Sequence, residues 1–431
     1  MTNVNVGGWD VSNVTDLTKA FYNAGITRFN GGTWNTRFVR DISSMFSGCP
    51  NLVYVDTGIW DTSSVQYAND FVADCSKLTN IDGMSDWNMT NMVDISSMFK
   101  NNPSLTFNLG TVVTGNKLTK ASSVFQGCAN ATTISVPSTL TKNVSDVSYF
   151  YDGCLKLVTP SSLNISNAKY ANGMYRYCQS LTGTLSVQPN ANLITNIAEM
   201  FKGCSKLTGV NFNVTSLALL EDVNSLFQGC IAMTTDNVSV LKSSTPVNMS
   251  NMYQGCRSMN SLDISALNFR DAIDISGIVN GCTQVTSLDM SAANTAELVN
   301  MNMAFANLSN CTSLKLPTSL AKVKQSQYAL SGCTKIQTLD IPASLTVIGK
   351  GFGANMPILK TINFKHAAGA TISFPEPGST TGAFYLPSIT GTEVKYASGN
   401  QSIAGYDWGA DNRDTSGFLA VASVTVNNYA S

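Results

Sequence analysis

The stretch Met200–Phe212, which reads MFKGCSKLTGVNF, contains the pattern that decides the fold. Its thiol, Cys204, is followed by apolar residues at offsets of three, six and eight. The next two cysteines, Cys230 and Cys256, follow at steps of 26 residues and are preceded by the similar words LFQG and MYQG. A fixed period of this length is typical of a solenoid built from stacked repeats.

All 11 cysteines belong to this series. Asn102 and Met356 take the cysteine position in two further repeats, and Ala24 takes it near the start. Together these positions predict about 14 rungs between residues 1 and 364.

Each rung has two predicted parts. After the cysteine, pairs such as Val210 and Phe212 alternate with polar residues, which predicts a short strand with one face inward. Before the cysteine, apolar residues such as Met92, Ile95 and Phe99 follow the helical period, which predicts a short helical turn. A glycine often precedes the thiol, and it suits either a helix end or a close backbone turn.

The predicted fold is therefore an α/β repeat solenoid of the leucine-rich-repeat type. Stacked parallel strands form one side of residues 1–364, and short helical turns form the other side. The repeat pattern stops after Phe364. Residues 365–431 contain glycine, proline and short apolar runs, which predict a small β-rich cap or attachment module.

The cysteines themselves invite a metal or a disulfide interpretation, but both fit poorly. Zinc sites need cysteines in clusters, and no two cysteines here are closer than 22 residues. The pattern favours a buried column of free thiols. Neighbouring rungs would still bring two thiols close enough for a cross-link.

Two stretches closely resemble the repeats of the BspA-like leucine-rich repeat proteins. They are WDTSSVQYANDFVADCSKLTNID at 60–82 and DWNMTNMVDISSMFKNNPSL at 86–105. The resemblance extends over about residues 8–364. It implies a leucine-rich-repeat fold and a role in adhesion or recognition at bacterial surfaces, and it implies no catalytic residues. The N-terminus departs from the family because no secretion leader or lipid-attachment cysteine is present there.

Composition excludes several classes of function. Charged residues make up 12% of the chain and the net charge is -1, so no basic field is available for nucleic acid. No run of 18 apolar residues and no signal peptide occur, which predicts a chain that is made in the cytoplasm and does not insert into a membrane.

No catalytic, cofactor or metal site is predicted. The single histidine, His366, lies just past the last rung, where a surface or turn position is expected, and no nucleophile is near it in sequence. Phosphate-binding, zinc-protease and calcium-loop motifs are absent from the sequence.

One polar column stands out seven residues after the cysteine position, on the outer face of the predicted strands. Two interpretations remain open: the column forms a recognition surface that also binds cations weakly, or its side chains fix neighbouring turns by hydrogen bonds. Its members, which we call the Asx ladder, are Asp56, Asp82, Asn211, Asp263, Asp289, Asp340 and Asn363.

Aromatic residues near the two ends are candidate interface anchors, and they are equally candidates for local core packing. They are Trp9, Tyr406, Trp408 and Tyr429.

These observations predict a structural and recognition protein rather than an enzyme. The favoured interpretation is a bacteriophage virion component exposed on the virion surface, such as a tail fibre or a capsid decoration. The alternative is a BspA-like adhesin on a bacterial cell surface. The expected partners are proteins or glycans of a cell surface and other subunits packed on either end, and homo-oligomers are a further expectation.

Overall fold

The computed structural model describes residues 3–107, 109, 112–236, 238–260, 262, 264, 267–375, 382–384, 393–396 and 400–406. The chain forms two compact units, Met1–Thr215 and Ser216–Ser431. Both are solenoids of stacked parallel strands, with about 13 turns in all. The predicted solenoid is confirmed, and the division near residue 215 was not predicted.

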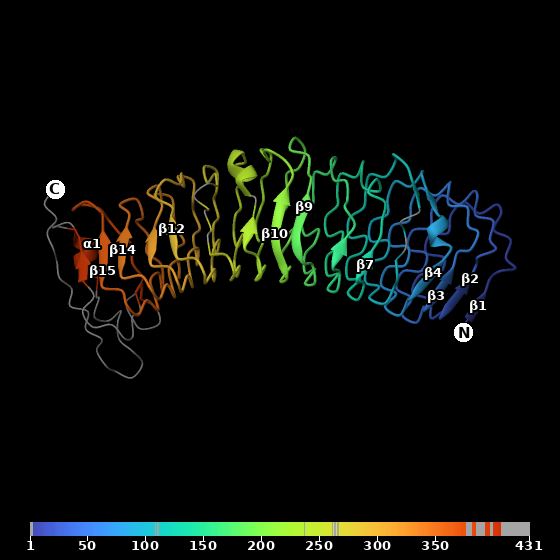
Figure 1. The fold of residues 1–431 in the computed structure, drawn as a ribbon, viewed down its shortest axis with the longest axis horizontal. Helices are drawn as coiled ribbons and strands as arrows, with labels where there is room; N and C mark the ends of the chain where they lie inside the picture. The colour runs from blue at the N-terminus through green and yellow to red at the C-terminus, as the bar shows by residue number, and fades with distance from the viewer. Residues whose placement is uncertain are drawn as a thin grey trace. The chain divides into compact units, whose positions relative to one another are not determined.

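The strands of the first unit are short and pair in parallel with the next rung (Figure 1). β1 to β4 form one sheet, β5–β6 and β7–β8 form two separate pairs, and β9 pairs in parallel with β10. Their bounds are β1 Asn3–Asn5, β2 Arg28–Asn30, β3 Tyr54–Asp56, β4 Asn80–Asp82, β5 Asn88–Met89, β6 Val113–Thr114, β7 Thr133–Ile134, β8 Thr159–Pro160, β9 Gly183–Val187 and β10 Leu207–Phe212.

The second unit repeats this arrangement. β12 pairs with β13, and β14, β15 and β16 form a three-stranded sheet. The bounds are β11 Thr235–Asp236, β12 Ser287–Asp289, β13 Ser313–Lys315, β14 Thr338–Ile341, β15 Thr361–Phe364 and β16 Glu393–Lys395. The one α-helix among the described residues is α1, Gln401–Ala404, and two 3-10 helices are present, η1 Met84–Asp86 and η2 Val238–Ser243.

Strand residues alternate between the core and the outside, as predicted. In β2, β3 and β4 the central residues Phe29, Val55 and Ile81 are buried and their neighbours are more exposed. Because the strands pair in register, the buried residues stack into continuous apolar columns. A single rung cannot bury its own inner face, so stability comes from this stacking.

The side of the solenoid opposite the strands, which we call the turn side, was predicted to consist of short helical turns. This prediction is wrong. In the rung of Cys49, the Met45 N–H donates to the Ile42 carbonyl at 3.2 Å, and the Cys49 N–H donates to the Phe46 carbonyl at 3.2 Å. Ser47 donates to the Ser44 carbonyl in the same way, so residues 42–49 form three overlapping turns. The alternate N–H groups donate to the next rung instead, as Ser44 does to the Asn69 carbonyl at 2.9 Å. A helix would direct every N–H to the carbonyl four residues earlier.

The successive turns still place apolar side chains inward at spacings of three and four residues. Ile42, Met45, Phe46 and Cys49 are all buried in this way. This spacing is the one that predicted a helix, so the apolar pattern alone does not distinguish the two structures.

The turns require backbone in the left-handed region at two positions four residues apart. Ser44 and Gly48 have φ of 53° and 74°, and Ser225 and Gly229 have 52° and 76°. The left-handed region is costly for residues with a Cβ. The glycine before the thiol therefore serves the close backbone turn, which was one of its two predicted roles.

Aspartate and asparagine begin many of these turns. Asp41 accepts from the Ser43 N–H at 2.8 Å, and Asp61 accepts from the Ser63 N–H at 3.0 Å. Such local bonds satisfy backbone groups that the cross-rung ladder leaves free.

The predicted boundary at residue 364 stays a prediction, since much of 365–431 lies outside the described residues. The parts that are described add to the stack: β16 pairs in parallel with β15, and Ser373 forms a bridge with Val347. The helix α1 is capped by Asn400, whose side chain accepts from the Ile403 N–H at 3.2 Å.

Candidate functional site

The Asx ladder of the first unit begins with two neighbouring aspartates. Asp56 and Asp82 are aligned in the β3–β4 register. Asp56 accepts from the Gly58 N–H at 2.9 Å, and Asp82 accepts from the Tyr54 hydroxyl and from Asn80. Asn211 is aligned with Ser186 in β9–β10, and its side chain donates to Asn213 at 2.8 Å. The structure thus places Asp56 beside Asp82 and leaves Asn211 in a different strand pair.

In the second unit, lysines that were not predicted pair with the aspartates of the ladder. Asp289 is aligned with Lys315, and the ion pair measures 2.6 Å. The Lys315 hydrogen bond, with further bonds from Ser291, lowers the pKa of Asp289. Asp340 accepts from Asn363 at 2.6 Å and lies 3.6 Å from the Lys365 ammonium.

Every ladder residue in the described part of the chain therefore has an intramolecular partner, which supports the turn-fixing interpretation. Asp263 lies outside the described residues. The recognition role of the ladder stays a prediction.

The four candidate anchor aromatics have different surroundings. Trp9 is 56% exposed and stacks on the buried Trp34 at 6.2 Å between ring centroids. Tyr406 is buried, stacks on Phe374 at 4.5 Å and accepts from the Ala383 N–H at 3.1 Å, so it belongs to the local core. Trp408 and Tyr429 lie outside the described residues.

The thiols form the buried column that the sequence predicted. The Cys204 thiol donates to the Tyr175 carbonyl of the preceding rung at 3.0 Å, and Cys128 donates to Phe99 at 3.2 Å. Asn102, which replaces a cysteine, donates to the Val72 carbonyl at 2.9 Å. Burial raises the pKa of Cys128 to about 12, so this thiol stays protonated and unreactive. All 11 cysteines are free.

The lone histidine also has a structural environment. His366 is 2% exposed, and its Nε2 lies 2.9 Å from the Leu345 carbonyl. The predicted surface position is wrong because the rung packs over this residue, and burial lowers its pKa. Among the described residues, no group of three His, Cys, Asp or Glu side chains is arranged to hold a metal, and no helix is long and apolar enough to span a bilayer.

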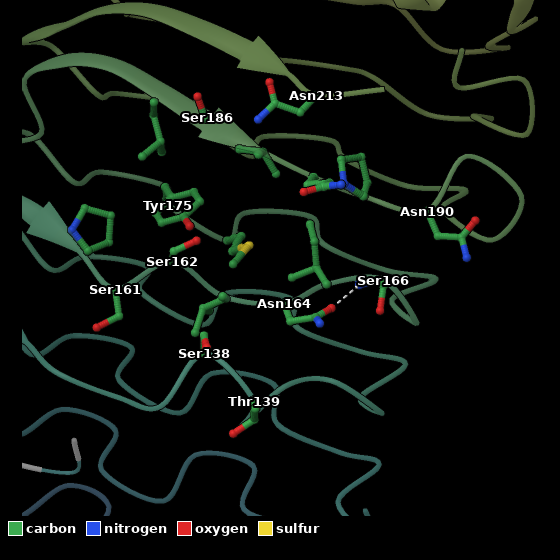
Figure 2. Close-up of a pocket in the computed structure, with 18 of the residues that line it drawn as sticks. Ser138, Thr139, Ser161, Ser162, Asn164, Ser166, Tyr175, Ser186, Asn190 and Asn213 are labelled. Atoms are coloured by element: carbon green, nitrogen blue, oxygen red, sulfur yellow. Dashed lines mark hydrogen bonds between the residues drawn. The ribbon is translucent and has the colours of Figure 1, made fainter. Parts of the chain in front are cut away.

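Both units contain a cleft where the strand ladder is interrupted. In the first unit, no ladder joins β8 to β9. A cleft of about 710 Å³, which we call the polar cleft, opens at this break (Figure 2). It is lined by Ser138, Thr139, Pro160, Ser161, Ser162, Leu163, Asn164, Ile165, Ser166, Met174, Tyr175, Leu185, Ser186, Val187, Gln188, Pro189, Asn190, Ala191 and Asn213.

The floor of the polar cleft contains a buried phenol. Tyr175 is 4% exposed, and its ring stacks between those of Tyr151 and Phe201 at 5.6 and 5.7 Å. Figure 2 shows Tyr175 among the cleft-lining side chains, with its oxygen toward Ser162. Its hydroxyl has no hydrogen-bond partner in the described part of the chain. The hydroxyl keeps contact with the open cleft, so it is available to hydrogen-bond a bound partner.

The second break lies between β13 and β14, which belong to different sheets. A cleft of about 690 Å³, which we call the lysine hollow, opens there. Lys315, Lys335 and Lys365 line it together with Asp340. Lys335 donates to Asn310 at 2.7 Å, and the other two lysines pair with aspartates.

Neither cleft was predicted from the sequence. Their residues come from different rungs, so no local motif in the sequence marks them. No histidine or thiol lines either cleft.

The chain is similar in fold to several solved leucine-rich repeat proteins. One from Bacteroides ovatus has 16% identity and a TM-score of 0.47, with 90% of this chain and 88% of that chain covered. A leucine-rich cell surface protein from Faecalibacterium prausnitzii has 13% identity and a TM-score of 0.38, with 77% of each chain covered. One from Eubacterium ventriosum has 17% identity and a TM-score of 0.33, with 74% and 77% covered. These likenesses identify no ligand.

No curated protein matches the sequence. A family model does match, in four overlapping segments at residues 1–112, 25–136, 108–216 and 195–316. The matched repeats confirm the resemblance to BspA-like repeats. No catalytic family matches, and nothing in these comparisons points to a virion. Because the matches extend through most of the chain, the protein belongs to the family described as "Mycoplasma protein of unknown function, DUF285".

Proposed function

We propose that this chain is a non-enzymatic recognition protein of a bacterial cell surface, which binds its partners at the strand side of the solenoid. The observation that carries the proposal is the position of the two clefts. In each unit, the cleft lies where the parallel ladder is interrupted, between β8 and β9 or between β13 and β14. Interrupted ladders expose backbone donors and acceptors beside side chains, and recognition surfaces use such groups.

The cell-surface alternative is preferred to the virion component that was favoured from the sequence. The matched family is described from Mycoplasma, which is a cellular organism. The packing of other subunits on the ends and the formation of homo-oligomers stay predictions, and so does the absence of an enzymatic activity.

The test is the binding of the fluorescently labelled full chain to intact bacterial and epithelial cells, measured by flow cytometry. Two variants fill the clefts separately: Ser162→Trp in the polar cleft and Ala343→Trp in the lysine hollow. Ser162 and Ala343 are exposed, so neither substitution disturbs the core. We expect saturable binding that falls at least about tenfold (about 1.4 kcal/mol) in one of the two variants, with an unchanged melting temperature.

The matched control is Ser85→Trp, which adds the same ring to the 3-10 helix η1 of the first unit, a helix that lines neither cleft. Binding that is equal in all three variants would contradict the proposed function, because it would exclude both clefts as the contact surface. Turnover of a glycan or peptide substrate that disappears in a cleft-filling variant would overturn the non-enzymatic proposal.

A further inference from the structure

The polar cleft carries a more specific inference, which rests on the proposed recognition function. We propose that it binds an extended, uncharged peptide segment of a partner protein, which pairs with the free edge of β9.

The first argument is the free strand edge. β9 is hydrogen-bonded to β10 on one side, and no ladder joins it to β8 on the other. The two rungs meet again at the parallel bridge between Ile165 and Pro189, so the free edge lies within β9. The Asn213 N–H donates to the Val187 carbonyl at 2.8 Å, which fixes Val187 as a residue whose backbone faces β10. Because backbone groups alternate along a strand, those of Thr184 and Ser186 face the break. An extended peptide would supply the matching donors and acceptors.

The second argument is the absence of charge. No lining residue is ionised at neutral pH, whereas the lysine hollow carries three ammonium groups and a carboxylate. A charged side chain placed in the polar cleft would lose water without gaining an opposite charge. An uncharged segment rich in Ser, Thr, Asn or small apolar residues loses little by comparison.

The third argument is the unpaired phenol on the floor. The Tyr175 side chain is largely buried, but its hydroxyl reaches the cleft (Figure 2). It can donate to a carbonyl or accept from an amide of an occupant. Ser162, Ser186 and Gln188 add exposed polar groups at the opening.

A neutral glycan is the competing occupant. It would also suit hydroxyl and amide side chains. However, no exposed aromatic ring lines the cleft for a sugar to stack on, and sugar hydroxyls do not reproduce the regular alternation of a strand edge. The geometry therefore favours the peptide, and the test below distinguishes the two.

The probe is the acetylated and amidated octapeptide LTGVNFNV, which copies residues 207–214 of this chain. Part of this sequence is β10, the strand that already pairs in parallel with β9, so its side chains are compatible with that neighbour. Binding to the full chain is measured by isothermal titration calorimetry. Two further peptides carry N-methyl groups on alternate amides: the first peptide is blocked along one strand edge and the second along the other. A fourth peptide has Asp at two positions.

We expect the unmodified peptide to bind saturably. One of the two N-methylated peptides should bind at least about tenfold more weakly, because its strand edge is blocked. The Asp-containing peptide should also bind at least about tenfold more weakly, because the cleft offers no positive charge.

On the protein side, Ser186→Pro removes an edge N–H that does not face β10, and Ser186→Val is its matched control because it keeps this N–H. The proline variant should bind at least about tenfold more weakly than the valine variant. Tyr175→Phe removes only the hydroxyl and should weaken binding severalfold. This second variant keeps the test valid if the proline variant does not fold.

The inference would be overturned if both N-methylated peptides bound as tightly as the unmodified peptide, or if no peptide bound at all. Saturable binding of maltohexaose or chitohexaose that is lost in Tyr175→Phe would assign the cleft to a glycan instead. In either case, cell binding that is still lost in Ser162→Trp would leave the proposed recognition function standing. If both cleft-filling variants still bind cells normally, the proposed function itself is contradicted.

Discussion

The turn side and the strand side both contain ion pairs between neighbouring rungs, but the surroundings of these pairs differ. On the turn side of the first unit, Arg176 contacts Asp152 at 2.9 Å, and their side chains are 25% and 6% exposed. On the strand side of the second unit, Lys315 contacts Asp289 at 2.6 Å, and these side chains are 63% and 52% exposed. The shorter contact belongs to the more exposed pair. Because water screens exposed charges, the distance alone does not indicate how much a pair contributes to stability.

Arg176 is the centre of a network that ties several rungs together. Its guanidinium donates to Asp152 and to Glu199, and Glu199 also accepts from Lys202. The rings of Tyr149 and Tyr177 lie 4.7 and 5.5 Å from the guanidinium carbon. Few waters can replace these partners, whereas water surrounds the strand-side pair. The turn side therefore holds rungs together, and the strand side remains available for binding.

The largest effect is expected from Arg176→Met. The substitution keeps an apolar stem but leaves the buried Asp152 carboxylate with Gln126 as its remaining side-chain partner. Removing one partner of a buried pair leaves an uncompensated charge. We expect the free energy of unfolding to fall by about 2–3 kcal/mol, measured by urea denaturation followed by circular dichroism.

The double variant Arg176→Met with Asp152→Asn is the control for this prediction. It removes the unpaired charge, so it should recover part of the lost stability. A loss below about 0.5 kcal/mol for Arg176→Met would show that the ion pairs of the turn side contribute no more to stability than those of the strand side.

The next effect is expected from the turn backbone itself. Gly255 has a φ of 75°, and an added Cβ would meet its nearest atoms, in Gly229, at ordinary contact distance of 3.9 Å. Gly255→Ala therefore isolates the conformational cost of a left-handed residue from any steric clash. We expect a loss of about 1–2 kcal/mol in the free energy of unfolding. Gly369→Ala is the control, because its Cβ meets nothing within 4 Å and its φ lies outside the left-handed region.

A smaller effect with a distinct pH dependence is expected from Glu199→Gln. Burial would raise the pKa of Glu199, but hydrogen bonds from Lys202 and Arg176 outweigh it and lower the pKa below the usual 4.5. A carboxyl with a lowered folded-state pKa stabilises the fold above its unfolded-state pKa, and this stabilisation is lost as the pH falls. The variant should be about 1 kcal/mol less stable than the natural chain at pH 7.

That difference should shrink as the pH falls below about 4.5, because the natural carboxyl then takes up a proton as well. Unfolding curves at pH 7, 5 and 3 would measure it. A difference that stays constant over this range would show that Glu199 acts through packing rather than through its charge.

The sequence predicted the solenoid, the thiol column and the inward strand residues, because each depends on a repeated position in one rung. It did not predict the Arg176 network. Asp152 and Arg176 both lie two residues before the cysteine of their rungs, but the residue type at this position changes from rung to rung, and Glu199 lies at a different position, five residues before its cysteine. It also mistook successive turns for helices. The left-handed positions, marked by glycines such as Gly48 and Gly127, were the signal that distinguishes them.

The clefts did leave a trace in the sequence. The step from Cys154 to Cys178 is 24 residues, and the polar cleft opens in this part of the chain. The step from Cys282 to Cys311 is 29 residues and the next, to Cys333, is 22, and the lysine hollow lies in these rungs. Irregular steps change how neighbouring strands meet, and both clefts lie beside such steps. Which side chains then line the gap depends on packing that the period does not encode.

The smallest effect is expected on the strand side, from Asp289→Ala. Its partner Lys315 is mostly exposed, so water replaces the lost carboxylate, and an exposed pair of this kind contributes about 0–1 kcal/mol. We expect a loss below about 0.5 kcal/mol, and raising the salt concentration should reduce it further because ions screen exposed charges.

Because this substitution hardly changes stability, it is also the cleanest test of the Asx ladder as a recognition surface. If Asp289→Ala and the matched Lys315→Ala both leave the melting temperature unchanged but weaken cell binding, the ladder takes part in recognition. If stability and binding are both unchanged, Asp289 serves the local turn through its bonds with Ser291, at 3.0 Å to the N–H and 2.6 Å to the hydroxyl. A stability loss as large as that of Arg176→Met would instead show that exposure is a poor guide to the strength of cross-rung pairs in this fold.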